Sequence, residues 1–221
     1  MPYTKTPAER AARLQRLLVT HPLGQAPSSQ VITYTEADLA RLWTGTPPLR
    51  PLIITIIGHG RNERLPLLFD AVGTAARALE PGAQPALVVC SSPDSRTDDA
   101  CRTLSLAARS GIHDSVFHAD RVPDDELSAL LASADAYLST ARHTDAFLWK
   151  AMACGTPPIV LSDADAEQVI VQGGYDANGW VSDPYADDLA ATLVQVCLHP
   201  AERLRRGAAA AARARAHKAG S

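Results

Sequence analysis

The chain has 221 residues, of which 46% are hydrophobic and 20% are charged, and its formal net charge is −3. This composition is typical of a globular protein with one good-sized domain or two small ones, and the slight negative charge excludes nucleic acid as the main partner. The chain opens on polar residues without a signal peptide, and no apolar run reaches the ~18 residues of a membrane span, so we expect a cytoplasmic protein.

The first 50 residues differ in pattern from the rest of the chain. They predict a helix near the start, a short strand, a second short helix, and a linker at residues 44–51, "TGTPPLRP", which is rich in proline. We therefore expect a helical N-terminal extension with its linker over residues 1–50 and a separate domain over residues 51–221.

The pattern becomes regular at residue 52, where the β-branched run "LIITII" predicts a strand that is buried on both faces. Further strands are predicted at residues 86–90, 115–118, 136–139, 158–161 and 179–181. Helices are predicted at residues 64–80, 98–111, 124–134, 145–155, 165–174 and 185–199, followed by an alanine-rich surface helix near 200–217 that frays. This alternation indicates a single Rossmann-like α/β domain with a doubly wound parallel sheet, which binds ligands at the carboxyl ends of its strands.

The loop after the first predicted strand, "GHGRNER", has the features of an anion site. Gly58 and Gly60 permit a tight turn and a close approach of the backbone to a ligand. Arg61 and Arg64 follow at the start of a helix, where free backbone N–H groups favour a phosphate or diphosphate. The alternative is a glycine-containing turn with two solvated arginines.

The next strand-to-helix loop, "CSSPDSRTDD", offers Ser91 and Ser92 as hydrogen-bond donors to a ligand at the sheet edge. Asp94 or Ser95 in the same loop more plainly caps the helix that follows. The two serines are therefore candidate binding residues, and a purely structural role for the loop is the favoured alternative.

The segment "STARHTDAFLWKAMACG" predicts a helix that begins at a cap formed by Thr144 or Asp145 and ends at Gly155. The prolines that follow it force an extended start to the next strand. Ala151, Ala153 and the glycine are small, so we expect this helix to pack closely against neighbouring backbone.

Lys150 lies in the middle of that helix, where a buried charge is costly unless it reaches a cleft or an anion. With Arg142 and His143 it predicts a basic mouth at the carboxyl edge of the sheet. The alternative is that the lysine side chain simply extends along the helix to the surface.

The chain shows no histidine spacing typical of a metal site and no nucleophile elbow of a Ser/His/Asp enzyme. The four cysteines lack C-x-x-C spacing, so we expect reduced thiols, with Cys90 and Cys154 buried. We expect neither a metal nor a cofactor.

Several collinear segments resemble retaining glycosyltransferases of family 4, which have the GT-B fold. In "ADAYLSTARHTDAFLWKAMACGTPPIV", Ser139 and the run from Ala151 to Pro157 match the hallmark segment of that family without a gap. Further family motifs resemble "GHGRNERLPLLFDAV", "FHADRVPDDELSALLASADAYLS" and "DAEQVIVQGGYDANGWVSDPYADDLAATL". The resemblance runs over about residues 52–199 and implies the nucleotide-sugar-binding C-terminal domain of the GT-B fold.

The family's Glu-x7-Glu pair is degenerate here, because Arg142 and Lys150 stand in its two positions. In the family the first glutamate contacts the sugar and the second contacts the ribose. Arg and Lys cannot accept hydrogen bonds from hydroxyl groups, so the resemblance implies that a nucleotide sugar is held differently or not at all. Arg64 stands near the family's basic position in the first loop, and Asp145 is the one carboxylate expected near the first glutamate position.

The family works in a cleft between two domains, and the acceptor-binding half requires roughly 100–150 residues. About 50 residues precede the first predicted strand here. We therefore expect an active enzyme to need a partner chain or a second copy to complete the cleft.

Two functions stay open at this point. In the first, the protein transfers a sugar from a nucleoside-diphosphate sugar to an unknown acceptor, and Arg61, Arg64 and Lys150 stabilise the leaving diphosphate. In the second, a catalytically inactive homologue acts as a binding or regulatory subunit. The charge reversal at the two glutamate positions favours the second function, and the retained arginines favour the first.

Overall fold

The computed structural model describes residues 50–57, 64–91, 99–119, 122–143 and 146–220. The elements predicted in residues 1–49 lie outside this part of the chain. The described residues form one parallel six-stranded sheet with the order β3-β2-β1-β4-β5-β6. The strands are β1 (Leu52–Ile57), β2 (Ala86–Ser91), β3 (Val116–Ala119), β4 (Ala136–Leu138), β5 (Pro158–Leu161) and β6 (Trp180–Ser182). The predicted parallel, doubly wound sheet is confirmed.

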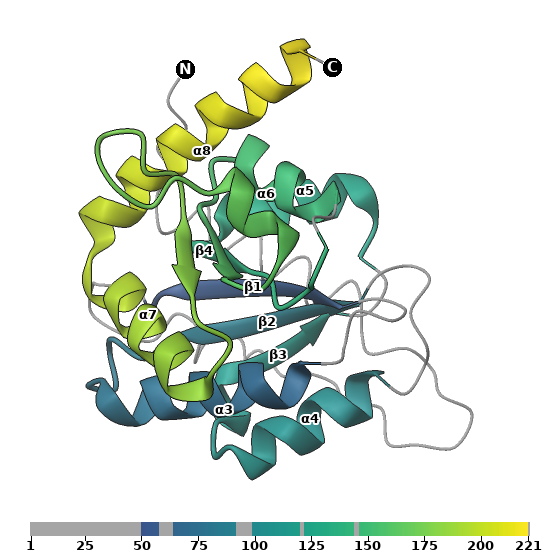
Figure 1. Cartoon of the computed structure of the whole chain (residues 1–221). Coiled ribbons are helices and arrows are strands. Elements are labelled where there is room, and N and C mark those ends of the chain that lie inside the picture. Colours follow the sequence, from purple (N-terminus) through teal and green to yellow (C-terminus); the bar gives the residue numbers. More distant parts are fainter. Residues whose placement is uncertain (1–49, 58–63, 92–98, 120–121, 144–145, 221) are drawn as a thin grey trace.

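Helices cover both faces of the sheet (Figure 1). One face carries α3 (Leu65–Ala78), α4 (Asp99–Arg109) and α7 (Ala186–Leu198). The other face carries α5 (Asp124–Ser133), α6 (Ala146–Ala153) and α8 (Pro200–Gly220). Two short 3-10 helices, η1 (His113–Ser115) and η2 (Asp165–Val169), lie in the connections.

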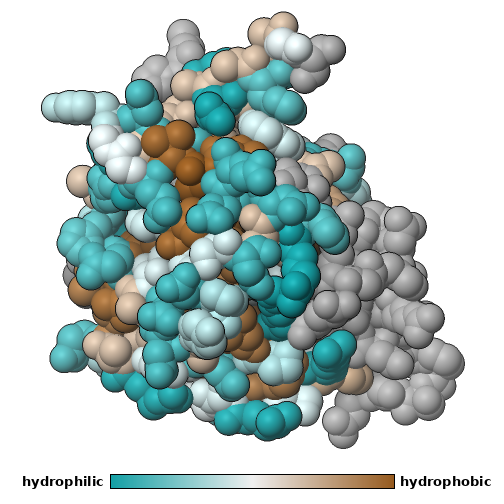
Figure 2. Space-filling model, in the orientation of Figure 1, coloured by the Kyte–Doolittle hydropathy of each residue, from teal (hydrophilic) through white to brown (hydrophobic). Residues whose placement is uncertain are grey.

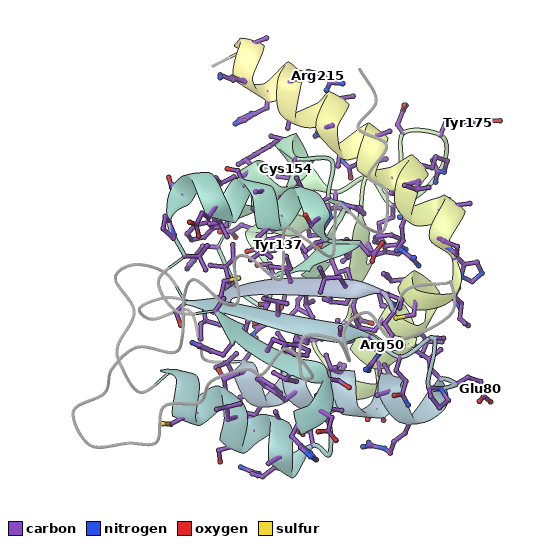
Figure 3. The ribbon with its side chains drawn as sticks, turned by 180° about the vertical axis from the view of Figure 1, so that it is seen from behind. Arg50, Glu80, Tyr137, Cys154, Tyr175 and Arg215 are labelled. Atoms are coloured by element: carbon purple, nitrogen blue, oxygen red, sulfur yellow. The ribbon has the colours of Figure 1, made fainter. Side chains whose placement is uncertain are left out.

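The side chains of β1 alternate between two hydrophobic layers. Ile54 packs in the layer beneath α5, α6 and α8, whereas Ile53 and Ile57 pack in the layer beneath α3, α4 and α7. Tyr137 on β4 is fully buried, and Figure 3 shows it between the sheet and the helices α5, α6 and α8. Burial on both faces explains why the strand is apolar except at the buried Thr55, without the alternation of a half-exposed strand.

Glycine ends two of the helices where the sequence predicted it. Gly155 has a φ of +77° after α6, and the N–H of Thr156 donates to the carbonyl of Ala151 at 3.0 Å. Gly111 has a φ of +71° after α4, and Ile112 donates to Ala107 at 3.0 Å. A left-handed residue followed by this long backbone bond satisfies carbonyls that the helix end leaves unpaired.

The helix predicted over residues 165–174 is wrong, because only η2 forms there and the chain then leaves helical geometry. The side chain of buried Asn178 accepts from the Val171 N–H at 2.9 Å and donates to the Val169 carbonyl at 3.3 Å. These bonds use the backbone groups that a continuing helix would need. Gly174, with a φ of +75°, further disfavours a helix in this stretch.

The predicted C-terminal helix is confirmed as α8, which is helical as far as Gly220 and packs against α6. Gly207, Ala210 and Ala214 form its buried stripe. The stripe brings Gly207 against Gly155, so that a Cβ added at Gly207 would stand 2.3 Å from the Gly155 carbonyl oxygen. Near its end, His217 stacks on Trp149 of α6 with ring centroids 3.9 Å apart.

Arginines fasten the first turns of α8 to the domain. Arg203 pairs with Asp135 at 3.3 Å, and Asp135 in turn accepts from the Leu52 N–H at 2.8 Å. Arg206 lies 4.6 Å over the ring of Trp180 and pairs with Glu202 at 2.7 Å. The helix is therefore held by charges at its start and by small residues along its length.

The chain enters the sheet at the amino ends of the strands. Arg50 donates to the carbonyls of Gln84 and Pro85 and to Ser115 Oγ, the last at 2.7 Å. These partners precede β2 and β3, so Arg50 ties three strand starts together (Figure 3). The described chain thus begins at the edge opposite the carboxyl ends of the strands.

The visible surface in Figure 2 is largely hydrophilic, with hydrophobic side chains gathered in the part of the view where α6 and α8 lie. No helix in the described part of the chain is long and apolar enough to cross a membrane.

The cysteines of the described residues are free thiols, as predicted. Cys90 and Cys197 are buried, and burial raises the pKa of each thiol to about 12, which keeps both protonated. Cys154 was expected to be buried but is only half-buried, because it lies on the edge of α6 and donates to the Ser128 carbonyl.

We predict that Gly207→Ala destabilises the domain, because its Cβ would overlap the Gly155 carbonyl oxygen. The expected loss in the free energy of unfolding is about 1–3 kcal/mol, although alanine is the better helix former by about 1 kcal/mol. Urea unfolding followed by circular dichroism measures it. The control is Gly82→Ala, where an added Cβ meets nothing within 4 Å. A Gly207→Ala variant as stable as the wild type would show that the two helices do not need this close approach.

Candidate functional site

The order of strands reverses between β1 and β4, and the helices after them, α3 and α6, lie on opposite faces of the sheet. In open parallel sheets such a reversal leaves a crevice at the carboxyl ends of the strands, where ligands bind. These ends lie toward the right of Figure 1. The predicted site residues follow these strands, so the topology brings their segments to one edge.

Several predicted site residues lie outside the described residues: Gly58, Gly60, Arg61, Ser92, Thr144 and Asp145. Their binding roles stay predictions. The structure does place the other predicted site residues, which are Arg64, Ser91, Arg142 and Lys150.

Arg64 stands at the N-cap of α3 and is joined to Asp163, which follows β5. Its guanidinium donates from Nη1 to Asp163 Oδ1 at 2.6 Å and from Nη2 to Oδ2 at 2.5 Å. Because β4 lies between β1 and β5, this bidentate pair spans the carboxyl end of β4. The Arg64 side chain is only 12% exposed and that of Asp163 is 35% exposed, so the carboxylate is the more accessible member of the pair.

The pKa of Asp163 lies below its ordinary value. The main cause is the hydrogen bond from Arg64, and the positive charges of Arg64 and Arg142 add to it. The carboxylate is therefore ionised at neutral pH, and it lies within electrostatic reach of both arginines.

The segment after β4 contributes Arg142 and His143, both exposed. The Arg142 carbonyl accepts from the Asp165 N–H at 2.9 Å, and His143 Nδ1 lies 2.9 Å from Asp165 Oδ2. These contacts join the β4 and β5 segments beside the Arg64–Asp163 pair. Among the described residues, the Arg142 guanidinium pairs with no carboxylate.

Lys150 reaches from α6 to the first turn of α5. Its Nζ lies 3.1 Å from Asp124 Oδ1 and donates to the Asp124 carbonyl at 3.1 Å. The Lys150 side chain is 25% exposed and the Asp124 side chain 85%. The lysine thus has a partner at the protein surface, and its contact with a ligand stays a prediction.

Ser91 ends β2 and is buried. Its Oγ lies 2.9 Å from Nε2 of His118, a buried residue on β3. The hydroxyl that was a candidate ligand donor therefore has a partner within the protein.

The described edge is charge-balanced, whereas the sequence predicted a basic mouth. Three of its basic side chains face carboxylates, in the pairs Arg64–Asp163, His143–Asp165 and Lys150–Asp124. Asp145 is therefore not the one carboxylate in this region, as the sequence had suggested. The rule that ligands bind after the strands would have identified Asp163 and Asp165, since both closely follow β5. The sequence could not show which bases they face, because these pairs join segments far apart in the chain.

The edge thus presents guanidinium groups beside carboxylates. Guanidinium groups bind phosphate oxygens, and carboxylates accept hydrogen bonds from hydroxyl groups. This combination suits a ligand that carries both phosphates and a sugar. No group of His, Cys, Asp and Glu side chains within the described residues could hold a metal ion.

Comparison with protein families matches residues 52–214 to the family described as glycosyl transferases group 1. A search of curated proteins finds no significant match. The fold is similar to those of several solved structures, three of which are described here by TM-score, sequence identity and the share of each chain that is covered. A glycosyltransferase from Rickettsia africae has a TM-score of 0.65 and 13% identity, over 96% of this chain and 48% of that chain. Sucrose-phosphate synthase from Thermosynechococcus elongatus has a TM-score of 0.62 and 21% identity, over 83% and 45%. HepE from Anabaena in complex with UDP-glucose has a TM-score of 0.58 and 16% identity, over 73% of this chain and 43% of that chain.

This chain therefore spans less than half the length of each of those three structures. At such identities the likeness shows the GT-B-type fold of this domain and not a shared substrate.

We predict that Arg64→Gln raises the pKa of Asp163 toward the ordinary value of about 3.9, because the variant removes the charge-assisted hydrogen bonds. Carboxyl NMR titration of both proteins measures this change. In the wild type the pair stabilises the fold above that ordinary pKa, and its contribution is lost as the pH falls through the lowered pKa of Asp163. The control is Arg77→Gln, which removes an arginine in the last turn of α3, far from Asp163, where it donates to Thr74. An unchanged Asp163 pKa in Arg64→Gln would contradict the pairing.

Proposed function

The chain belongs to the glycosyl transferases group 1 family, and we propose that it transfers a sugar from a nucleoside-diphosphate sugar to an acceptor. The single observation that carries this proposal is the meeting of Arg64 and the Arg142 segment at the reversal of strand order. A structural neighbour, HepE, is in complex with UDP-glucose, which supports the choice of ligand class.

The chemistry proposed for the arginines is stabilisation of the leaving group. Negative charge builds on the phosphate oxygens as the bond between sugar and diphosphate breaks. Arg64 and Arg142 present fixed positive charges at that edge, where they lower the free energy of the departing diphosphate. Arg61, Gly58 and Gly60 belong to the same loop in the sequence and are proposed to complete the phosphate site.

We propose that the hydrogen bonds from the sugar hydroxyl groups are accepted by carboxylates outside the Glu-x7-Glu positions. Arg142 and Lys150 stand in the positions of the family 4 glutamates, yet the Asp165 N–H donates to the Arg142 carbonyl, the Asp165 carboxylate lies beside His143, and Asp124 pairs with Lys150. A carboxylate is thus restored beside each altered position by the neighbouring loop or helix. This supports assignment to retaining family 4 with a degenerate Glu-x7-Glu pair, and it weakens the argument for an inactive homologue.

The second wall of the cleft is proposed to come from a protein surface outside the matched residues. The three structural neighbours are more than twice the length of the part that this chain matches. The sequence-based hypothesis assigns that wall to a partner chain or a second copy. We also propose that the protein is cytoplasmic and that its nucleotide-sugar-binding domain begins near residue 51.

We predict that the protein binds UDP or GDP and that Arg64→Gln weakens this binding at least about tenfold, about 1.4 kcal/mol. Isothermal titration calorimetry measures both dissociation constants, with Arg77→Gln as the control on α3. Release of free nucleoside diphosphate from the corresponding sugar nucleotides measures turnover. Binding without turnover in any assembly would support a regulatory subunit, and the absence of binding to either nucleotide would refute the donor site.

A further inference from the structure

Asp163 holds the arginine that the proposed function assigns to phosphate. Both of its carboxylate oxygens accept from the Arg64 guanidinium, in the end-on bidentate geometry with which arginine also binds a phosphate. A phosphate cannot take that end of the guanidinium while the carboxylate remains there. Ligand binding at Arg64 therefore requires an exchange of one anion for another.

We propose that Asp163 acts as an internal competitor at the phosphate site, so that an anion binds well there only if it makes a contact beyond the one with Arg64. This inference rests on the proposed donor site and adds a residue that sets the affinity a ligand has to reach. Displacement of Asp163 is the common cost of binding, and the number of phosphate groups decides which ligands overcome it.

The geometry gives the diphosphate its advantage. A monophosphate that displaces Asp163 replaces one bidentate contact with another and gains little. A diphosphate carries a second phosphate group, which can contact the guanidinium of Arg142, whose charge already acts on Asp163. Because Arg142 has no carboxylate partner among the described residues, this second contact displaces no carboxylate of that part of the chain.

Asp163 is also placed so that it can move aside. It lies in the turn directly after β5 and its side chain is 35% exposed, so a displaced carboxylate can be solvated. The strand end itself is held by other contacts, since the Ser162 N–H donates to the Ser182 carbonyl at 2.8 Å and Ser162 Oγ donates to Asp183 at 2.7 Å. Release of Asp163 therefore does not require β5 to move.

The test compares four nucleotides on the wild type and on Asp163→Asn by isothermal titration calorimetry. UDP and GDP represent the diphosphates, and UMP and GMP represent the monophosphates. Asparagine keeps the shape of the side chain but removes its charge, so we expect monophosphate affinity to rise about tenfold, which is about 1.4 kcal/mol. Diphosphate affinity should rise by a similar factor, because the same carboxylate is displaced, and the wild type should prefer the diphosphate of the nucleotide it accepts.

The matched control is Asp183→Asn, which removes a carboxylate bonded to the neighbouring Ser162 and should leave all four affinities unchanged. Asp163→Ala is the second variant, and it should bind monophosphates like Asp163→Asn. Urea unfolding of each variant shows that the protein is folded under the titration conditions.

Two results would overturn the inference in distinguishable ways. If the wild type binds a diphosphate and both Asp163 variants leave monophosphate affinity unchanged or lower, Asp163 positions Arg64 and does not compete with the ligand. If neither the wild type nor the variants bind any of the four nucleotides, the proposed donor site itself fails, and the competing role of Asp163 fails with it.

Discussion

The reversal of strand order between β1 and β4 is the constraint on which the candidate site depends. Every strand of a parallel sheet delivers its following loop to the same edge, but at the reversal the next helices leave toward opposite faces. Here α3 and α6 diverge in this way, and Arg64 and Arg142 follow β1 and β4 at the carboxyl edge where the order reverses. Without the reversal, the helices would pack side by side and leave no space between their first turns.

Ion pairs between distant segments then determine which charges this edge of the sheet presents. A mostly buried guanidinium without a counter-charge would destabilise the fold, and Asp163 provides that counter-charge for Arg64. In the proposed site, the same contact sets the threshold that an anionic ligand has to overcome. Under that proposal, the stability of the unliganded domain and its affinity for anions are coupled through one pair of side chains.

The C-terminal helix supports the face of the sheet on which α6 lies. Its stripe of small residues allows the backbones at Gly207 and Gly155 to meet, and α6 begins beside the proposed ligand site. Arg203 connects the same helix to Asp135 at the amino edge of the sheet. One element thus holds both ends of this face, and α8 is a structural part of the domain.

Local sequence determined the strands and helix ends of this protein, because these depend on side chains close together in the chain. The apolar run 52–57 forms a strand, Gly155 ends α6, and the arginine in the first loop stands at the start of α3, all as predicted. Tertiary structure alone decided that Asn178 replaces a helix after η2 and that α8 packs on α6. It alone also decided which carboxylates face the basic residues: the side chains of Arg64 and Asp163 are 99 positions apart in sequence. A pattern of neighbouring residues carries no information about such a pair, whose distance is set by the order of strands in the folded sheet.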